Sequence, residues 1–411
     1  QPEKRGVINY VQKNRMKIIL NSKDLPDWLG DGLIGVDLMF DETSYLEMEK
    51  ALLKVMKAKG DRLAELRDIL FAAKATNRKI PVAMPVLPQL NNSQVEAVHQ
   101  ILQTPDVAVI HGPPGTGKTT TLVQAIRQAT QSEAVVLVTA PSNAAVDLLT
   151  ERIAQQGINV VRIGNISRID ESLLQHTLDL KMSSHPDSKH IKKVKIQAAD
   201  YRRMARKYKR SFGRKEREQR NLLHKEAREL SSWANQLEDR LLDQILHSAA
   251  VITCTLVGAS QSMLDRLKFK TVFIDEAAQA LEPATWIPIL RASKVVLAGD
   301  PFQLPPTVKS NLAMRQGFNK TMIERCIEMA PSEDTPSVSL LKVQYRMNEK
   351  IMAFSNRQFY DNQLRAAEQV CGWSLGLEDE SVVSFIDTAG CSFDEKINPA
   401  YQSRYNPDEY N

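Results

Sequence analysis

The residues with the clearest chemistry in this 411-residue sequence form a Gly-x4-Gly-Lys-Thr pattern, at Gly112, Gly117, Lys118 and Thr119. An apolar run at 107–110 precedes it, and a helical pattern follows. A strand that feeds a glycine-rich loop and then a helix aims successive backbone N–H groups at one point, where phosphates bind. Lys118 would reach the β- and γ-phosphates, and the Thr119 hydroxyl would ligate Mg²⁺. The alternative, a surface turn beside an unrelated lysine, is disfavoured because strand, loop and helix come in the required order.

The whole loop is therefore expected to surround a nucleoside triphosphate. Its glycines allow close approach of a phosphate chain to the backbone. The predicted binding residues are Gly112, Pro113, Pro114, Gly115, Thr116, Gly117, Lys118, Thr119 and Thr120.

Two acidic residues, Asp275 and Glu276, end a second apolar run at 271–275. One carboxylate can hold Mg²⁺ through water, while its neighbour orients and deprotonates the attacking water. A single carboxylate here could be a helix N-cap, but two at the end of a buried strand favour catalysis. After the next apolar run, Gln303 carries an amide able to contact the γ-phosphate or the attacking water. An ordinary Asp-Pro turn is the alternative interpretation of that segment.

The elements that must position these residues follow a regular alternation of apolar runs and helical patterns. The runs lie at 107–110, 135–139, 159–163, 249–254, 271–275 and 294–298. This alternation predicts an α/β fold, a parallel sheet covered on both faces, within residues 81–335. Nucleotide sites in such sheets lie at the carboxyl ends of strands. The loops after 110, 275 and 298 are therefore expected to share one crevice.

A basic segment interrupts this alternation at about 171–245. The whole chain has a net charge of +5, yet residues 181–230 contain 17 Lys and Arg against 6 Asp and Glu, a local balance of +11. We predict an inserted helical hairpin that contacts a phosphate backbone, since aromatic residues are interleaved with the cations. A solvated helix face is the alternative. The candidate contact residues are Arg202, Arg203, Lys207, Lys209 and Arg210.

The flanking regions predict further subdomains but show no chemistry. Residues 1–40 contain short β-patterns at 6–10, 16–20 and 32–36, which indicate a partial β-barrel. Residues 41–80 read as a stalk-like helical segment, and prolines follow it. At 90–98, Ser93 is the expected N-cap of a helix, with Glu96 as its capping-box partner. Residues 336–411, with a helix expected at 351–360 and a strand at 382–386, indicate the start of another domain.

The totals place the protein in a broad class. The length predicts two or three domains, and 43% hydrophobic with 25% charged residues is typical of soluble globular proteins. No apolar run approaches the roughly 18 residues that span a bilayer, and no signal sequence is visible. Four cysteines without CxxC spacing indicate reduced thiols. We expect a cytoplasmic monomer without a membrane partner.

Together the motifs resemble superfamily 1 helicases of the group that contains the nonsense-mediated-decay helicase, senataxin and the immunoglobulin-µ-binding-protein helicase. The matching stretches run in family order over almost the whole chain: LNNSQVEAV (90–98), HGPPGTGKTTT (111–121), APSNAAVD (140–147), FIDEAAQALEPATWIP (273–288), LAGDPFQLPPT (297–307) and VQYRMNEKIM (343–352). The resemblance implies two RecA-like domains, an inserted β-barrel and a basic helical insertion. It also implies ATP and Mg²⁺ as cofactors, and ATP-driven 5′→3′ movement along single-stranded RNA or DNA.

The resemblance assigns roles to single residues. Gln94 would read the adenine and Tyr345 would stack on it. Gln303 would sense the γ-phosphate, and Arg346 would be an arginine finger beside Lys118, Asp275 and Glu276. Three more residues, Ser142, Asn143 and Thr255, would touch the nucleic-acid backbone.

The sequence departs from the family pattern near its end. No Gln-Gly-x-Glu motif and no Thr-Arg-Ala motif follows, and the sequence begins inside the predicted β-barrel, so we expect a fragment that is truncated at both ends. A metabolic kinase is disfavoured because no acceptor pocket or lid is visible beside the motifs at 275–279 and 299–303. The other open hypothesis is a nucleic-acid-binding module whose ATP site is idle in this form. RNA and DNA cannot be told apart, because backbone binding with stacking tolerates any sequence.

Overall fold

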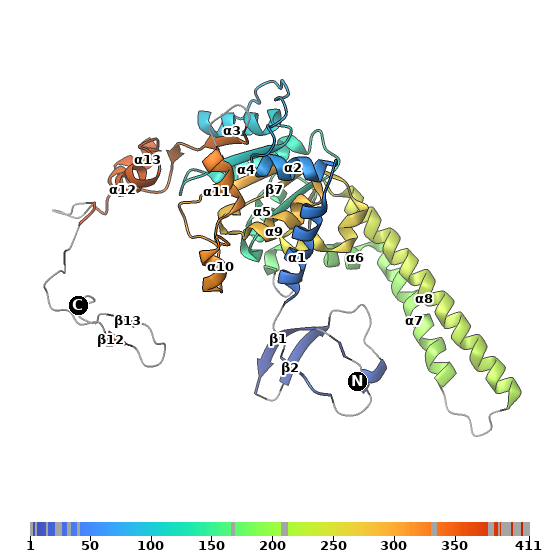
Figure 1. Cartoon of the computed structure of the whole chain (residues 1–411). Coiled ribbons are helices and arrows are strands. Elements are labelled where there is room, and N and C mark those ends of the chain that lie inside the picture. Colours follow the sequence, from blue (N-terminus) through green and yellow to red (C-terminus); the bar gives the residue numbers. More distant parts are fainter. Residues whose placement is uncertain are drawn as a thin grey trace. The chain divides into compact units, whose positions relative to one another are not determined.

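The computed structural model describes residues 3–4, 6–13, 15–20, 27–30, 34–38, 42–165, 169–206, 213–329, 335–376, 382–384, 387, 396–397 and 404–405. The chain divides into two compact units, Gln1–Leu341 and Lys342–Asn411 (Figure 1). Each unit is described by itself below. Among the described residues, no helix is both long enough and apolar enough to span a lipid bilayer.

The first unit is built on a parallel sheet, as the alternating sequence pattern predicts. In the described part of the chain, seven strands form it in the order β5-β6-β4-β7-β8-β3-β9, and every pairing is parallel. Their bounds are β3 Val107–His111, β4 Val136–Ala140, β5 Val160–Arg162, β6 Val251–Thr255, β7 Phe269–Ile274, β8 Ala292–Gly299 and β9 Ser337–Leu340. The three predicted loops follow β3, β7 and β8, which are neighbours in this order, so their carboxyl ends meet at one edge.

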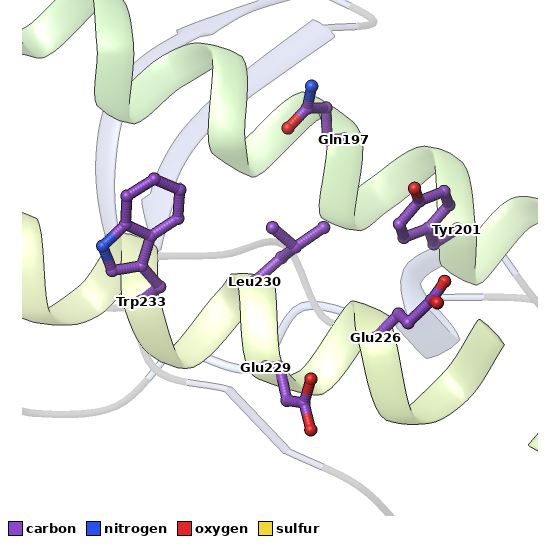
Figure 2. Close-up of a pocket in the computed structure, with 6 residues that line it drawn as sticks. All are labelled: Gln197, Tyr201, Glu226, Glu229, Leu230 and Trp233. Atoms are coloured by element: carbon purple, nitrogen blue, oxygen red, sulfur yellow. The ribbon is translucent and has the colours of Figure 1, made fainter. Parts of the chain in front are cut away.

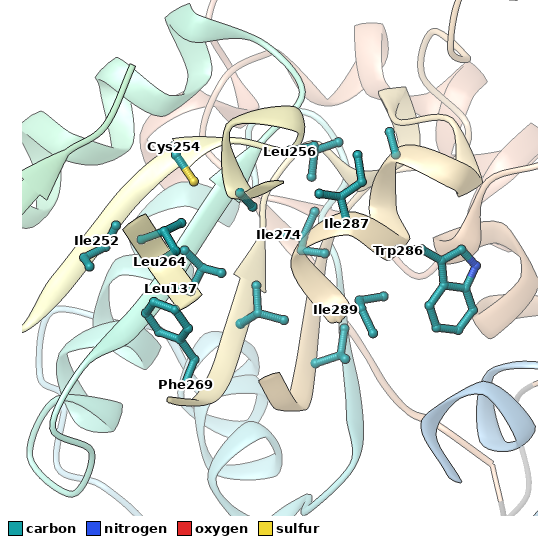
Figure 3. Packing of buried hydrophobic residues seen from close by; sticks show 14 of the residues in the cluster. Leu137, Ile252, Cys254, Leu256, Leu264, Phe269, Ile274, Trp286, Ile287 and Ile289 are labelled. Atoms are coloured by element: carbon teal, nitrogen blue, oxygen red, sulfur yellow. The ribbon is translucent and has the colours of Figure 1, made fainter. Parts of the chain in front are cut away.

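Alternate residues of each strand enter two separate hydrophobic clusters, one on each face of the sheet. On β8, for example, Val295 and Leu297 belong to one cluster while Val296 and Ala298 belong to the other. Figure 3 shows part of the first cluster, in which Trp286 and Phe269 lie with residues of β4, β6 and β7. Because both faces are covered, the strands are apolar almost throughout. This burial holds the strand ends, and thus the loops, in fixed places.

The helices that cover the two faces come from different parts of the sequence. Helices α3 (Asn92–Gln103), α4 (Lys118–Ala129) and α5 (Asn143–Gln155) carry the residues of one cluster. On the other side lie α1 (Thr43–Lys57), α2 (Arg62–Leu70), α9 (Glu282–Ile289) and α11 (Met322–Met329). Shorter elements are α10 (Asn311–Arg315), η4 (Val257–Ser260), η5 (Ser262–Arg266) and η6 (Ala277–Gln279). The predicted stalk-like segment, 41–80, therefore contributes α1 and α2 to the main core.

The described residues of the N-terminal region form an antiparallel hairpin of β1 (Gly6–Gln12) and β2 (Arg15–Leu20), and then η1 (Asp27–Gly30). The third strand predicted at 32–36 is wrong for residues 34–36, which form no strand, while 32 and 33 lie outside the described residues. Isolated β-branched residues next to glycine carry too little pattern to specify a strand.

The basic segment folds as the predicted helical hairpin. It comprises η3 (Glu171–His176), α6 (Leu178–Ser184), α7 (Pro186–Arg206) and α8 (Arg214–Ser248). Helices α7 and α8 lie side by side (Figure 1). Small or β-branched apolar residues form the buried seam between them, including Val194, Ala198, Ala227 and Ala234. Such a narrow apolar stripe leaves the remaining faces to charged side chains. Residues 207–212, with the candidate contacts Lys207, Lys209 and Arg210, lie outside the described residues.

The boundary between the units differs from the sequence-based prediction. Strand β9 was expected to open the second domain at 336, but it pairs with β3 and completes the first sheet. The hydroxyls of Ser337 and Ser339 both donate to Gln100 Oε1 on α3, at 2.8 and 3.0 Å. The first unit therefore extends to Leu341.

The second unit begins at Lys342. Its described elements are β10 (Val343–Gln344), β11 (Arg365–Ala366), α12 (Glu349–Phe359), α13 (Glu368–Cys371), β12 (Lys396–Ile397) and β13 (Arg404–Tyr405). Strands β10 and β11 pair in parallel, and α12 matches the helix predicted at 351–360. The strand predicted at 382–386 is absent from 382–384, and 385–386 lie outside the described residues.

Cys254 and Cys326 are buried free thiols, and Cys371 is free as well. Burial raises the pKa of the Cys254 and Cys326 thiols to about 12. Both groups are therefore protonated and unreactive at neutral pH. Cys391 lies outside the described residues.

Lys294, near the start of β8, is a buried lysine whose effect on the stability of the fold can be tested. Burial lowers the pKa of its ammonium group from 10.5 to about 8, although Glu133 and Asp106 act to raise it. The folded state thus binds this proton more weakly than the unfolded chain, so the free energy of unfolding increases as the pH rises from about 8 to 10.5. We expect Lys294→Met to stabilise the protein at neutral pH by about 1–3 kcal/mol, less the lost bond to Ile101 O.

Urea unfolding at neutral pH and at about pH 10 measures this difference. The advantage of Lys294→Met must shrink at the higher pH, because the wild-type lysine is then less protonated in both states. Lys320→Met, on the surface, is the control. A stability difference that does not change with pH would contradict the assigned titration.

Candidate nucleotide-binding site

The predicted phosphate loop lies between β3 and α4. Gly115 and Gly117 have φ values of 76° and 75°, a left-handed conformation that favours glycine. Gly117 is also the N-cap of α4, so the helix begins at Lys118 with its first N–H groups directed at the loop. A Cβ on Gly112 would lie 2.8 Å from the Cβ of Lys118, which is why this position has no side chain. The Gly112 N–H donates to Gly299 O at 3.0 Å, so the loop is held against the end of β8.

Gly117→Ala is expected to abolish most nucleotide affinity. Its new Cβ would lie 2.5 Å from Gln94 Nε2, so the loop or Gln94 must shift. Gly157→Ala is a matched control, because Gly157 has a φ of 74° with nothing within 4 Å of the added Cβ. Both changes carry the same backbone cost of about 1–2 kcal/mol. Titration with a fluorescent ATP analogue, beside melting temperatures, separates the two effects. Equal affinities for the two variants would contradict the role of the loop.

Gln94 supports the loop from helix α3. The predicted cap at Ser93 with Glu96 is wrong: Asn91 is the N-cap, and its side chain accepts from Gln94 N while Gln94 Oε1 accepts from Asn91 N. The helix begins two residues earlier because the Asn91 side chain satisfies its first donors. Gln94 Nε2 donates to Thr116 O at 2.9 Å, and the side chain is buried. Its contact with adenine stays a prediction.

The acidic pair lies directly beside the loop, as predicted. Lys118 Nζ is 2.7 Å from Glu276 Oε1 and 3.7 Å from Asp275 Oδ1. Asp275 is 3% exposed, and this burial raises the pKa of its carboxyl group, against the effect of Lys118. The Asp275 N–H donates to Thr139 O at 2.9 Å, and Asp275 Oδ1 accepts from Glu276 N at the same distance. Lys118 therefore serves as the counter-cation of both carboxylates.

Glu276 has a strained backbone. Its φ of 51° and ψ of 36° lie in the left-handed region, although it is not a glycine. Such a conformation costs about 1–3 kcal/mol and persists where the surrounding structure enforces it. The side chain is partly exposed, and Gln279 Nε2 donates to its Oε2 at 3.3 Å. The strain is located at the residue predicted to activate water.

The residues expected to hold Mg²⁺ fit this ion. Asp275 offers a carboxylate and Thr119 a hydroxyl, which are the hard oxygen ligands that Mg²⁺ prefers. Among the described residues no group of three or more His, Cys, Asp or Glu side chains could form a complete metal cage. Mg²⁺ is usually held by one or two protein ligands together with substrate phosphates. The two residues are therefore suited to a cation that arrives with a nucleotide.

Gln303 is held by Asp300 in the loop after β8. Gln303 Nε2 donates to Asp300 Oδ2 at 2.9 Å, and Phe302 N donates to Asp300 Oδ1 at 3.2 Å. The buried ring of His111 contacts the same Asp300 Oδ1 through Nε2, at 3.1 Å. The sequence analysis missed His111 and Asp300 as supporting residues. Both residues lie within motifs that match the helicase family, at 111–121 and 297–307, and this position could have identified them.

Tyr345 and Arg346 belong to the second unit and are both exposed. Buried Gln344 shapes their turn: its Oε1 accepts from the N–H groups of Arg346 and Met347, at 2.8 and 2.9 Å. Its Nε2 donates to Met347 O at 2.7 Å. The turn is thus built by Gln344, a residue the sequence analysis did not single out. The adenine and arginine-finger roles stay predictions.

Ser142 and Asn143 follow strand β4, and Thr255 is the last residue of the neighbouring strand β6. Ala140 at the end of β4 is paired with Thr255 at the end of β6, so the three residues share one edge of the sheet. Ser142 Oγ accepts from Ala145 N, and Thr255 Oγ1 accepts from Gly258 N, each at 3.1 Å. Asn143 Oδ1 accepts from an arginine, Arg162, at 2.9 Å. Each side chain therefore accepts a bond from its own chain and retains hydrogens to donate, which suits phosphate oxygens.

The cations of the hairpin are partly engaged with its own residues. Arg202 Nη2 donates to Ser231 Oγ at 2.7 Å, and Arg203 Nη2 donates to Asp200 Oδ1 at 2.9 Å. An open pocket of about 410 Å³ lies between α7 and α8. Figure 2 shows that Gln197 and Tyr201 line it from α7, and Glu226, Glu229, Leu230 and Trp233 from α8. Its two carboxylates would repel phosphates, so this pocket is not the predicted backbone contact.

Two protein-family models, both described as AAA domain, match residues 89–311 and 318–411. DNA-binding protein SMUBP-2 of Rattus norvegicus is 36% identical over 90% of this chain and 38% of its own length. An uncharacterized ATP-dependent helicase of Methanocaldococcus jannaschii is 30% identical over 97% of this chain and 65% of its own. A regulator of nonsense transcripts 1 homolog of Neurospora crassa is 36% identical over 69% of this chain and 24% of its own.

Solved helicase structures are also similar to the chain. Pif1 helicase from Candida albicans is 15% identical, with a TM-score of 0.31, over 67% of this chain and 44% of its own. The chain spans well under half the length of the SMUBP-2 relatives and about two thirds of the M. jannaschii helicase.

Proposed function

The chain belongs to the superfamily 1 helicases of the group that contains the nonsense-mediated-decay helicase and senataxin, and on this premise we propose that it couples ATP hydrolysis to movement along single-stranded nucleic acid. The observation that best supports this proposal is the contact of Lys118 with both Asp275 and Glu276. It brings together, at the carboxyl edge of one parallel sheet, a lysine suited to bind phosphates, a carboxylate suited to ligate Mg²⁺ and a carboxylate suited to act as a base.

Lys118 Nζ lies 2.7 Å from Glu276 Oε1 and forms an ion pair with this carboxylate. The phosphates of ATP would attract the ammonium group, since they carry more charge than one carboxylate. Release from Lys118 would leave Glu276 able to orient and deprotonate water for attack on the γ-phosphate. Mg²⁺, when bound beside Asp275 and Thr119, would neutralise charge that develops on the phosphates. The same lysine therefore links substrate binding to the availability of the base.

The nucleic acid would lie along the edge formed after β4 and β6. Ser142, Asn143 and Thr255 offer hydrogen-bond donors there, and the α7–α8 hairpin adds positive charge through residues such as Arg202 and Arg203. Donors to phosphate bind RNA and DNA alike, so we propose single-stranded RNA and DNA as substrates. The 5′→3′ direction of movement rests on family membership.

Strand displacement tests the proposed direction. We expect ATP-dependent unwinding of a labelled duplex that carries a 5′ single-stranded tail, and none of a duplex with a 3′ tail. The same duplexes without ATP are the control. Unwinding from the 3′ tail alone would contradict the direction, while binding without hydrolysis would favour a module whose ATP site is idle.

The remaining proposals concern the state of the protein. We propose that it acts as a monomer in the cytoplasm and uses ATP with Mg²⁺. Light scattering during gel filtration tests the first point, and fractionation of cells that express the protein tests the second. A metal titration of nucleotide hydrolysis tests the third.

A further inference from the structure

A buried arginine, Arg162, connects strand β5 to the start of helix α5. Its side chain has no exposed surface, a rare environment for a guanidinium group. Nε donates to Asp147 Oδ1 at 2.9 Å, Nη1 to Ile163 O at 2.6 Å and Nη2 to Asn143 Oδ1 at 2.9 Å. One planar group thus serves two acceptors on α5 and the backbone carbonyl of the residue directly after β5.

The surroundings hold this guanidinium in one place. A Cβ on Gly164 would lie 2.9 Å from Arg162 Nη1, so the glycine makes room for it. The second oxygen of Asp147 accepts from Asp170 N at 3.3 Å, which fixes the carboxylate from its other side. Burying such a pair is expensive, and hydrophobic residues of similar volume often stabilise a fold as well. Stability alone therefore does not account for an arginine here.

The chemistry of the bond determines how Asn143 is oriented. A guanidinium group only donates, so the Asn143 amide must turn its oxygen toward Arg162. The two Nδ2 hydrogens then face away from the guanidinium. Asn143 is the first residue of α5, directly after the N-cap Ser142, and it is partly exposed. Backbone N–H groups at this helix start also favour anions.

We infer that Arg162 is a positioning residue, which fixes the Asn143 amide so that its hydrogens meet phosphate oxygens of single-stranded nucleic acid. This rests on the proposed function, because it requires nucleic acid at the start of α5. Without Arg162, the amide could turn and present its oxygen, which phosphate would repel. Arg162 itself touches no substrate.

A double-mutant cycle tests the inference. Arg162 and Asp147 are changed together, as Arg162→Met with Asp147→Leu, because removing one partner alone would leave a buried charge unpaired. This pair of changes is made with and without Asn143→Ala. Arg325→Met with Glu282→Leu removes a second ion pair, which is partly buried, and is the matched control. Anisotropy of labelled oligo(dT) and oligo(U) gives the affinity, and melting curves show that each variant folds.

We expect the Arg162/Asp147 change to weaken nucleic-acid binding about tenfold, the value of one good hydrogen bond. In this variant the nucleic-acid concentration that gives half-maximal ATP hydrolysis rises by the same factor, while the maximal rate of hydrolysis is retained. In the Asn143→Ala background the same change has no further effect. Arg162→Lys with Asp147 intact restores only part of the affinity, because the single nitrogen of an ammonium group cannot reach acceptors that three separate guanidinium nitrogens serve.

Two results would overturn the inference. If the Arg162/Asp147 change weakens binding equally in the Asn143→Ala background, Arg162 acts on α5 as a whole and not through the amide. If Asn143→Ala leaves the affinity unchanged, Asn143 makes no contact and Arg162 has nothing to position. The proposed function is tested separately, by measuring whether nucleic acid stimulates ATP hydrolysis in the wild-type protein.

Discussion

Replacing Glu276 by glutamine is expected to slow ATP hydrolysis by about 10²- to 10⁴-fold, the range of a lost general base. The amide keeps the size of the side chain but cannot take a proton from water. It also ends the ion pair with Lys118, whose Nζ lies 2.7 Å from Glu276 Oε1. Lys118 is then free for the phosphates, so we expect ATP to bind at least as tightly as in the wild type.

Single-turnover hydrolysis and nucleotide titration measure these two effects separately. Glu328→Gln is the matched control, since Glu328 is exposed and forms a surface ion pair with Lys320. Loss of ATP affinity in Glu276→Gln would show that the carboxylate supports the phosphate loop. Hydrolysis at the wild-type rate would assign the base to another residue.

Replacing Lys118 by methionine is expected to lower ATP affinity, which the Glu276→Gln change is expected to retain. It removes a charge-assisted contact with the phosphates, worth about 1.5–3 kcal/mol, so ATP affinity falls by about 10- to 150-fold. The change also leaves Asp275, which is 3% exposed, beside Glu276 with no counter-cation. We expect the nucleotide-free protein to lose up to about 3 kcal/mol of stability, the lower end for a broken buried ion pair.

A second substitution separates these effects. Lys118→Met with Asp275→Asn removes the buried charge, so the stability is expected to return while ATP affinity stays low. Urea unfolding and nucleotide titration of both variants provide the test. Stability unchanged in Lys118→Met would mean that the lysine does not neutralise Asp275 in the folded protein.

The sheet, and the edge of it that carries the candidate site, were predictable because their sequence signals are local. Each apolar run, such as 271–275, is long enough to specify a buried strand, and the carboxyl ends of parallel strands must meet. This is why the sequence alone predicts that Lys118 and Glu276, 158 positions apart, lie at one edge of the sheet. The helical hairpin was predictable from its composition, which is dense in charged residues and contains few strand formers.

Features that depend on tertiary partners could not be predicted. Strand β9 is short, and only its pairing with β3 shows that Ser337 belongs to the first sheet. The N-cap of α3 was missed for a local reason: Asn91 and Ser93 are both good N-caps, and only the reciprocal bonds between Asn91 and Gln94 identify Asn91 as the cap. Arg162 looks like any surface arginine, because its burial and its bond to Asn143 arise only when β5 lies beside α5.

The measurement that tests the central claim most directly is the rate of ATP hydrolysis with Mg²⁺, with and without poly(U) and poly(dT). A motor that moves along single strands must couple hydrolysis to the polymer, so we predict slow hydrolysis alone and strong stimulation by at least one of them. The ratio of the two rates gives the preference for RNA or DNA. Tight binding of both polymers, with hydrolysis that neither of them changes, would contradict the account.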